Sequence, residues 1–248
     1  MIPKVIHYCW LSNDPLPKKI QFCIDSWAKK IPDYEVVLWD FNRFPKDKST
    51  WVSEAFDAKK YAFAADYIRF YALYNYGGIY LDSDVEVLKN FDEFLNLPYM
   101  LGCENLSGNI EAAVIGAEKG FVPFKKMLDY YEGRHFVNAD GSFNSTPVPR
   151  LMDKILGDEY KFVKIDNPAE FRNNPDELCI LPNDYFSPVH LLTMKLEKTP
   201  RTVAIHHFAG SWESNSYKFR KKMQKLLGHR VSLAIIKAKS ILKSLINR

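Results

Sequence analysis

The sequence predicts an α/β fold, and three observations support this expectation. Strand-like and helix-like segments alternate along the first half of the chain. Apolar residues recur at helical spacing over residues 17–30 and 61–75, whereas residues 5–10 and 34–39 are short apolar runs. A double glycine at residues 77–78 then ends the second helix and leads into another apolar strand. This alternation is typical of a sheet covered by helices.

Length and composition favour one large globular domain. The chain has 248 residues, of which 47% are hydrophobic and 15% aromatic, so it can bury a large core and is not mainly disordered. No apolar run is long enough for a transmembrane helix, and the first residues lack the pattern of a signal peptide. We therefore expect a cytoplasmic protein. The scattered cysteines favour buried free thiols over disulfides or a zinc cluster.

The basic charge of the chain is concentrated at its end. The net charge is +4, but residues 214–248 carry ten Lys or Arg and no Asp or Glu, which leaves the preceding part at −6. We therefore divide the chain into a domain over residues 1–213 and a basic tail over residues 214–248. Apolar tail residues share one helical face, which fits either a helix packed on the domain or an amphipathic helix on an anionic membrane. No nucleic-acid-binding motif accompanies these charges, so no nucleic acid partner is expected.

Two carboxylates follow the apolar strand after the double glycine. Asp82 and Asp84 are one residue apart, so on an extended chain both side chains point to the same side. Such oxygen ligands are preferred by Mg²⁺ and Mn²⁺. A solvated turn would also explain the pair. However, apolar residues flank it on both sides, and a buried carboxylate needs a partner. The pattern favours a divalent cation site.

Three further candidates lie on the predicted helix and strand nearby. Asp66 and Arg69 stand three residues apart on the helix over residues 61–75 and share a face. They are either a surface ion pair or a pair that contacts a sugar and a phosphate. Trp10 ends the first strand, where ligands bind in open α/β sheets. It is either a core residue or a platform for a nucleobase.

Two adjacent histidines follow a predicted strand at residues 202–205. Alternation places the rings of His206 and His207 on opposite sides, so at most one of them faces a given site. A neutral imidazole would complete a metal site built on aspartates, and Trp212 offers an apolar wall with an N–H donor. Residues 133–149 are rich in Gly, Asn, Ser and Pro, which predicts a long surface loop that contacts substrate.

Four blocks of the chain together resemble a known family. Residues 2–10, 60–69, 77–84 and 205–212 are similar, in this order, to the DXD-containing sugar transferases of glycosyltransferase family 32. That group includes bacterial capsular-polysaccharide enzymes and fungal outer-chain mannosyltransferases. The resemblance implies a GT-A type, Rossmann-like nucleotide-sugar-binding fold with a mixed central sheet. It also implies a divalent cation, Mn²⁺ or Mg²⁺, and retention of the anomeric configuration. The C-terminal helical tail lies outside it.

The resemblance also implies roles for the residues that could hold a metal. Asp82 and Asp84 would form the DXD motif, with Asp84 the more direct ligand and Asp82 shared between metal and donor. His207, chosen over His206 for its spacing to Trp212, would complete the metal shell.

The remaining matched residues would bind the donor. Asp66 and Arg69 would hold its sugar and phosphate, and Arg69 would assist departure of the diphosphate. Trp10 would stack on the base, and Trp212 would close over the diphosphate.

The expected function is a metal-dependent glycosyltransferase for surface or capsular polysaccharide. It would move a sugar from a UDP- or GDP-linked donor to a glycan or lipid-linked acceptor, in the cytoplasm or against the inner face of the membrane. Two alternatives stay open: a toxin-like transferase that modifies a protein side chain, and a binding module without turnover. A phosphatase fits less well, because its DxD should follow the first strand. Glu104, Asn105 and Glu111 lack a motif that would mark a nucleophile, and same-face attack without a covalent intermediate is equally open.

Overall fold

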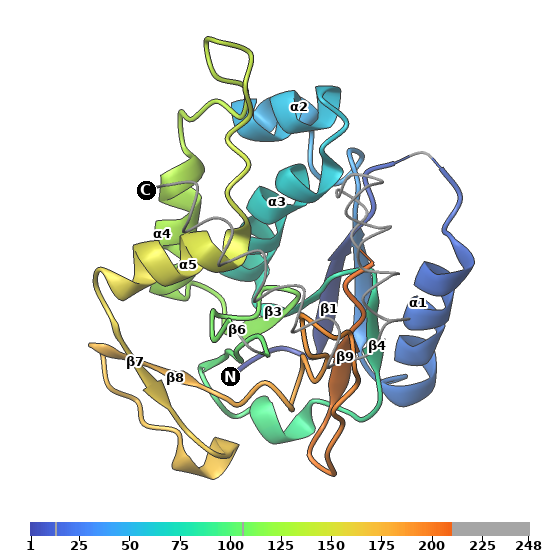
Figure 1. The fold of residues 1–248 in the computed structure, drawn as a ribbon, viewed down its shortest axis with the longest axis vertical. Coiled ribbons are helices and arrows are strands. Elements are labelled where there is room, and N and C mark those ends of the chain that lie inside the picture. Colours follow the sequence, from blue (N-terminus) through green and yellow to red (C-terminus); the bar gives the residue numbers. More distant parts are fainter. Residues whose placement is uncertain (13, 106, 210–248) are drawn as a thin grey trace, which may run out of the picture.

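A five-stranded mixed sheet lies at the centre of the computed structural model, which describes residues 1–12, 14–105 and 107–209 (Figure 1). Strand order is β2-β1-β3-β6-β5, with β1, β2 and β3 parallel and β6 antiparallel to β3 and β5. The strands are β1 (Val5–Cys9), β2 (Glu35–Trp39), β3 (Gly78–Leu81), β5 (Tyr99–Met100) and β6 (Val114–Ala117). This mixed sheet confirms the predicted fold class. Trp212 and the tail lie outside the described residues.

Two small sheets bring later parts of the chain against the central sheet. β4 (Val85–Val87) pairs antiparallel with β9 (Ala204–His206), and β7 (Lys161–Lys164) pairs parallel with β8 (Glu177–Ile180). The first pair matters for the site, because β4 follows β3 after a three-residue turn and β9 is the last described strand.

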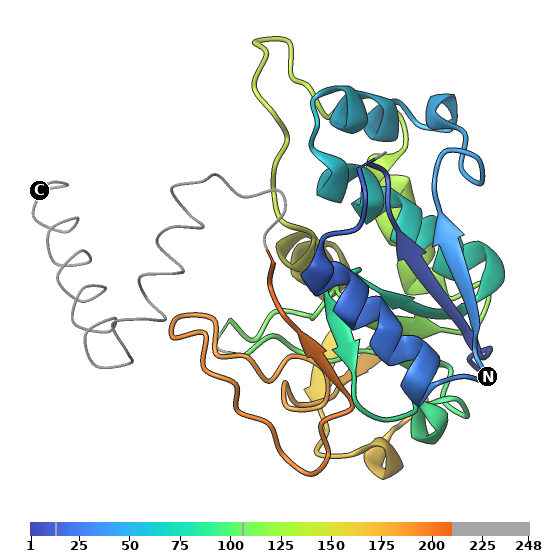
Figure 2. The ribbon, with the colours of Figure 1, turned by 90° about the vertical axis from the view of Figure 1, so that its right-hand side faces the viewer.

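Helices cover both faces of the central sheet (Figures 1 and 2). The described α-helices are α1 (Lys18–Lys30), α2 (Thr50–Asp57), α3 (Tyr61–Tyr76), α4 (Val122–Tyr131) and α5 (Val148–Gly157). Neighbouring side chains of β1 point to opposite faces. Tyr8 packs edge-on against Trp27 of α1, with ring centroids 5.2 Å apart, whereas His7 contacts Tyr76 at the end of α3. Helices α1 and α3 therefore lie on opposite sides of the sheet.

A tight connection joins α3 to β3. Gly77 follows the helix with φ of 69° and donates its N–H to the carbonyl of Leu73 at 2.9 Å. Gly78, with φ of 110°, begins a strand in which every residue is buried. The left-handed φ values explain why glycine stands at both positions. The connection delivers the end of β3, and the carboxylates that follow it, to a fixed place.

Several elements differ from the sequence prediction. Helices α2 and α5 and the β7–β8 pair were not predicted. Helix α5 begins inside the predicted loop at residues 133–149. Its first turn contains Pro149 and follows Pro147. Proline usually indicates a loop, but it is also tolerated at the start of a helix, which explains why the loop was predicted too long. No helix within the described ranges is long and apolar enough to cross a membrane.

Replacing Gly78 by Ala tests how strongly this connection constrains the fold. A Cβ atom at Gly78 would lie 2.6 Å from the carbonyl oxygen of Val5, in addition to the strained φ. We expect Gly78→Ala to lower the free energy of unfolding by about 3 kcal/mol. Gly120→Ala is the matched control, because its φ is 82° but nothing lies within 4 Å; it should cost about 1 kcal/mol. Urea denaturation followed by circular dichroism measures both, and equal losses would contradict the collision with β1.

Candidate functional site

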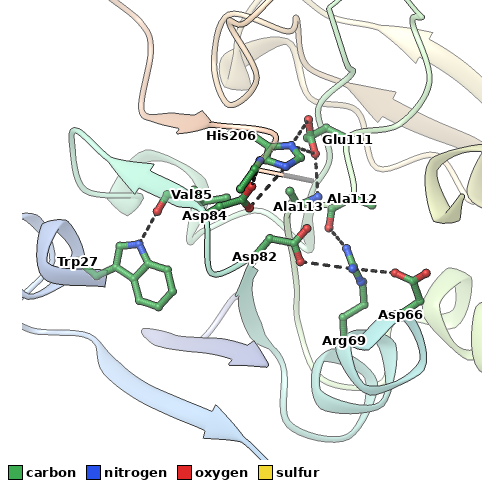
Figure 3. A network of polar contacts seen from close by, with 11 residues as sticks. Trp27, Asp66, Arg69, Asp82, Asp84, Val85, Glu111, Ala112, Ala113 and His206 are labelled. Atoms are coloured by element: carbon green, nitrogen blue, oxygen red, sulfur yellow. Dashed lines mark hydrogen bonds and ion pairs between the residues drawn. The ribbon is translucent and has the colours of Figure 1, made fainter. Parts of the chain in front are cut away.

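Asp82 and Asp84 lie in the turn where the chain leaves the central sheet (Figure 3). The N–H of Asp82 donates to the carbonyl of Ala113 at 2.9 Å, and the carbonyl of Asp82 accepts from Val85 at 3.0 Å. The Oδ2 atom of Asp84 accepts the N–H of Ala209 at 2.6 Å. The two side chains are 28% and 12% exposed, so neither is fully buried.

Strand β9 brings a histidine to these carboxylates. His206 lies opposite Val85 in the β4–β9 pair, and its Nε2 atom is 3.6 Å from Oδ1 of Asp84. One ligand atom from each of Asp82, Asp84 and His206 lies within 4.8 Å of the others. We call these three residues the Asp–Asp–His cluster.

The Asp–Asp–His cluster fits a divalent cation. Two ligands bound at ~2.1 Å to one small cation lie roughly 3–4 Å apart, so side-chain shifts below about 1 Å would close the cluster around an ion. Two carboxylate oxygens and one imidazole nitrogen suit Mn²⁺ and Mg²⁺. The described residues therefore contain a candidate cation site at the predicted motif.

The structure places His206, and not the predicted His207, beside the aspartates. The ring of His207 turns away, and its Nε2 atom is 2.9 Å from Oε2 of Glu86. Its N–H donates to the carbonyl of Asp84 at 3.2 Å. The cause is the antiparallel register, which sets His206 opposite the residue after Asp84 and sends the next ring to the other side. Alternation was foreseen, but the register that chooses between the rings was not.

Arg69 connects helix α3 to the cluster from inside the protein (Figure 3). Its Nη2 atom lies 2.8 Å from Oδ1 of Asp66 and 3.3 Å from Oδ1 of Asp82. Its Nη1 atom donates to the carbonyl of Ala112 at 2.6 Å, and its guanidinium lies over the ring of Tyr80. The side chains of Arg69 and Asp66 are only 4% and 8% exposed, which excludes the surface ion pair that the sequence left open. The network holds Asp82, while contact of Asp66 or Arg69 with a donor stays a prediction.

Burial and neighbouring charges shift the pKa of two site residues in informative ways. Burial raises the pKa of Asp66 to about 7, although Arg69 opposes this shift. Burial lowers the pKa of His206, but the carboxylates of Glu111 and Asp84 outweigh it and raise the pKa to about 9. Without a cation, His206 is therefore a charged partner of the carboxylates at neutral pH. A cation must replace its Nε2 proton to use that nitrogen.

The structure describes only one of the two tryptophans that were predicted to contact the donor. Trp10 is partly exposed in the loop after β1, and its Nε1–H donates to the carbonyl of Asp14 at 3.0 Å. Because β1 and β3 are parallel neighbours, Trp10 and Asp82 lie at the same edge of the sheet. Stacking of Trp10 on a base stays a prediction, and Trp212 lies outside the described residues.

The predicted substrate loop is fastened to helix α2 by one carboxylate. Glu54 accepts the N–H groups of Phe136 and Val137 at 2.8 and 3.0 Å and contacts the ring of His135 at 2.6 Å. A cavity of about 540 Å³ lies between the helix and the loop, with Trp51 among its lining residues. The loop projects beyond the helices in Figure 1. Its contact with substrate stays a prediction.

Sequence reasoning gave no role to Glu111 and none to the contacts that hold β4. Glu111 is only 1% exposed and faces the ring of His206. From α1, the Nε1–H of Trp27 donates to the carbonyl of Val85 at 2.8 Å, and Oγ of Ser26 accepts the N–H of Val87 at 2.8 Å. All of these partners are remote in sequence, so no local motif marks them.

Comparisons with known proteins point to one family. Residues 17–100 match the family model described as "Glycosyltransferase sugar-binding region containing DXD motif". The chain is 37% identical over 123 residues to inositol phosphoceramide mannosyltransferase 3 of Schizosaccharomyces pombe, covering 48% of this chain and 34% of that protein. It is 31% identical over 196 residues to mannosyl phosphorylinositol ceramide synthase CSH1 of Saccharomyces cerevisiae, covering 75% of this chain and 49% of that protein. The chain thus spans about half or less of these relatives. The sequence comparisons confirm the predicted resemblance to DXD-containing sugar transferases.

The chain also aligns with part of a solved structure. The PaToxG glycosyltransferase aligns with 64% of this chain and 69% of its own, with a TM-score of 0.48 and 22% sequence identity.

Two single variants separate the adjacent histidines. We expect His206→Ala to weaken Mn²⁺ binding by at least about tenfold, because loss of even an outer-shell partner costs 10–100-fold. His207→Ala removes the neighbouring ring, which contacts Glu86, and should leave the dissociation constant within about twofold. Isothermal titration calorimetry measures both constants. A larger loss of Mn²⁺ affinity in His207→Ala than in His206→Ala would contradict the assignment of His206 as the ligand.

The buried Asp66 predicts a pH dependence of stability. An aspartate normally has a pKa of about 3.9, so a folded-state pKa of about 7 means that the folded protein binds this proton more tightly. The free energy of unfolding should therefore fall as pH rises between about 4 and 7. Asp66→Asn mimics the protonated form and should flatten this part of the curve.

Urea denaturation in EDTA at about pH 5 and about pH 7.5 measures this effect. Asp25→Asn changes an exposed carboxylate on α1 and should keep the wild-type slope. Identical slopes in wild type and Asp66→Asn would show that Asp66 is ionised across this range.

Proposed function

We propose that this relative of the DXD-containing sugar transferases is a metal-dependent glycosyltransferase. It would move a sugar from a nucleotide-sugar donor to a glycan or lipid-linked acceptor, with retention, in the synthesis of a surface polysaccharide or glycolipid. The observation that carries the proposal is the Asp–Asp–His cluster. Its two aspartates form the DXD motif within the residues that match the family model, and β9 adds His206 from outside that match.

The chemistry follows from the charge that sugar transfer creates. Breaking the bond between the anomeric carbon and the diphosphate leaves negative charge on the departing oxygen. A divalent cation bound by Asp82, Asp84 and His206 would stabilise that charge. Asp84 is held in place by the N–H of Ala209, and Asp82 by Arg69 and Ala113. Both carboxylates are thus oriented before a donor arrives, which lowers the reorganisation needed during transfer.

The relatives and the tail composition support a lipid-linked acceptor and a mannosyl donor. Two relatives are named as enzymes that mannosylate inositol phosphoceramide or make its mannosylated form. In addition, residues 214–248 carry ten Lys or Arg and no Asp or Glu, a composition that favours contact with an anionic membrane. We therefore place a GDP-linked mannose first among donors and a phosphate-bearing lipid first among acceptors.

Hydrolysis and binding of a panel of UDP- and GDP-sugars test the proposal. We expect one donor to release its nucleoside diphosphate in Mn²⁺ or Mg²⁺ and not in chelator. Asp84→Asn should reduce this release roughly 100-fold or more, since it weakens the cation that stabilises the leaving group. The amide oxygen can still accept from Ala209, so the fold should persist. Asp25→Asn, which removes an exposed carboxylate on α1, should keep wild-type release.

The remaining outcomes distinguish the alternatives. Binding of a donor without release, even with lipid and glycan acceptors present, would favour a binding module. Transfer only to a protein side chain would favour a toxin-like enzyme. Binding of no nucleotide sugar would contradict the proposed donor site.

A further inference from the structure

Glu111 is the most deeply buried carboxylate among the described residues, at 1% exposure. It lies just before β6, in a segment that contacts each part of the site. One carboxylate oxygen, Oε1, accepts the N–H of Ala113 at 2.8 Å. The same oxygen lies 3.2 Å from Nδ1 of His206, and the other lies 3.4 Å from it.

The ring of His206 spans the distance between two carboxylates (Figure 3). Its Nδ1 atom faces Glu111, and its Nε2 atom faces Asp84 at 3.6 Å. An ionised carboxylate only accepts hydrogen bonds, so the contact with Glu111 requires a hydrogen on Nδ1. In the neutral ring that hydrogen leaves the lone pair on Nε2, the nitrogen that belongs to the Asp–Asp–His cluster. Stacking on Phe208, with centroids 3.8 Å apart, further limits rotation of the ring.

We propose that Glu111 is a positioning residue that fixes the tautomer and orientation of His206 for a cation. The inference rests on the proposed function in one respect, namely that the cluster binds a divalent cation. Carboxylate partners of metal-bound histidines act in this way by setting which ring nitrogen is free. Glu111 itself is too buried to reach a sugar, so the geometry gives it no direct part in bond breaking.

A purely structural role explains Glu111 less well. A buried carboxylate costs stability unless it is paired and hydrogen-bonded. Within the described residues, its ion-pair contact is with His206 and not with a Lys or Arg side chain. The carbonyls of the next two residues are occupied elsewhere, because Ala112 accepts from the Arg69 guanidinium and Ala113 accepts from the N–H of Asp82. Besides the ring, the carboxylate interacts with the N–H of Ala113 and with the hydroxyl group of Ser187.

The direct test is the tautomer of His206 in protein with ¹⁵N-labelled histidine, assigned with a His206→Asn variant. Ring ¹⁵N shifts are recorded in metal-free protein as the pH is raised until the ring is neutral. We expect the neutral ring to carry its hydrogen on Nδ1 in wild type, and a mixture or the Nε2–H form in Glu111→Gln. A neutral wild-type ring that carries its hydrogen on Nε2 would overturn the proposal. This measurement needs no cation and no folded variant of Glu111.

Mn²⁺ affinity gives the second readout. We expect Glu111→Gln to weaken binding 10–100-fold with an unchanged circular dichroism spectrum. Glu104→Gln is the matched control. Glu104 is a nearby, half-buried carboxylate that contacts Ser107 and not the ring, so its removal should change the affinity less than about threefold. Equal losses in both variants would show that net charge, and not positioning, is responsible. If wild type bound no Mn²⁺ while the ring carried its hydrogen on Nδ1, the proposed metal dependence would fail and the positioning of His206 would stand.

Discussion

The site depends on the neutralisation of one buried charge, the guanidinium of Arg69. Burying a cation costs several kcal/mol unless anions and hydrogen bonds surround it. Asp82 supplies an anion, the carboxyl group of Asp66 accepts a hydrogen bond, and the carbonyl of Ala112 accepts another. Asp66 belongs to α3, whereas Asp82 follows β3. Compensation of the charge therefore fixes the helix, the strand end and the segment before β6 in one arrangement, from which the carboxylates of the turn point outward.

The position of the Asp–Asp–His cluster follows from a change of sheet. β3 is a central strand, yet β4 leaves that sheet and pairs with β9. Asp82 and Asp84 lie in the turn between the two sheets, where backbone groups bind to Ala113, His207 and Val85 instead of a strand ladder. Helix α1 holds the second sheet through its contacts to both ends of β4. A turn at a junction of this kind can expose carboxylates while its backbone stays paired.

Local patterns in the sequence were sufficient for the central part of the site. Apolar spacing predicted α3, the double glycine its end, and the i, i+2 carboxylates the candidate cation site, because each signal lies within a few residues. The choice between His206 and His207 required the register of two strands that are far apart in the sequence. No local pattern marked Glu111 as a site residue, because its partner is the ring of His206, which is distant in the sequence and comes close only in the folded chain. Helix α5 was missed because Pro147, before its first turn, and Pro149, within that turn, are as typical of loops as of helix starts.

The late position of β9 in the chain has a consequence for biosynthesis. Helix α3 and strand β3 leave the ribosome long before Ala204–His206, and domains generally begin to fold from the N-terminal side. Until β9 pairs with β4, Asp84 lacks both the imidazole and the N–H of Ala209. Contacts between distant parts of a chain also form slowly, because a long loop must close first. A nascent chain that stops before β9 would thus hold the two carboxylates without the imidazole, and the Asp–Asp–His cluster would form only once β9 pairs with β4.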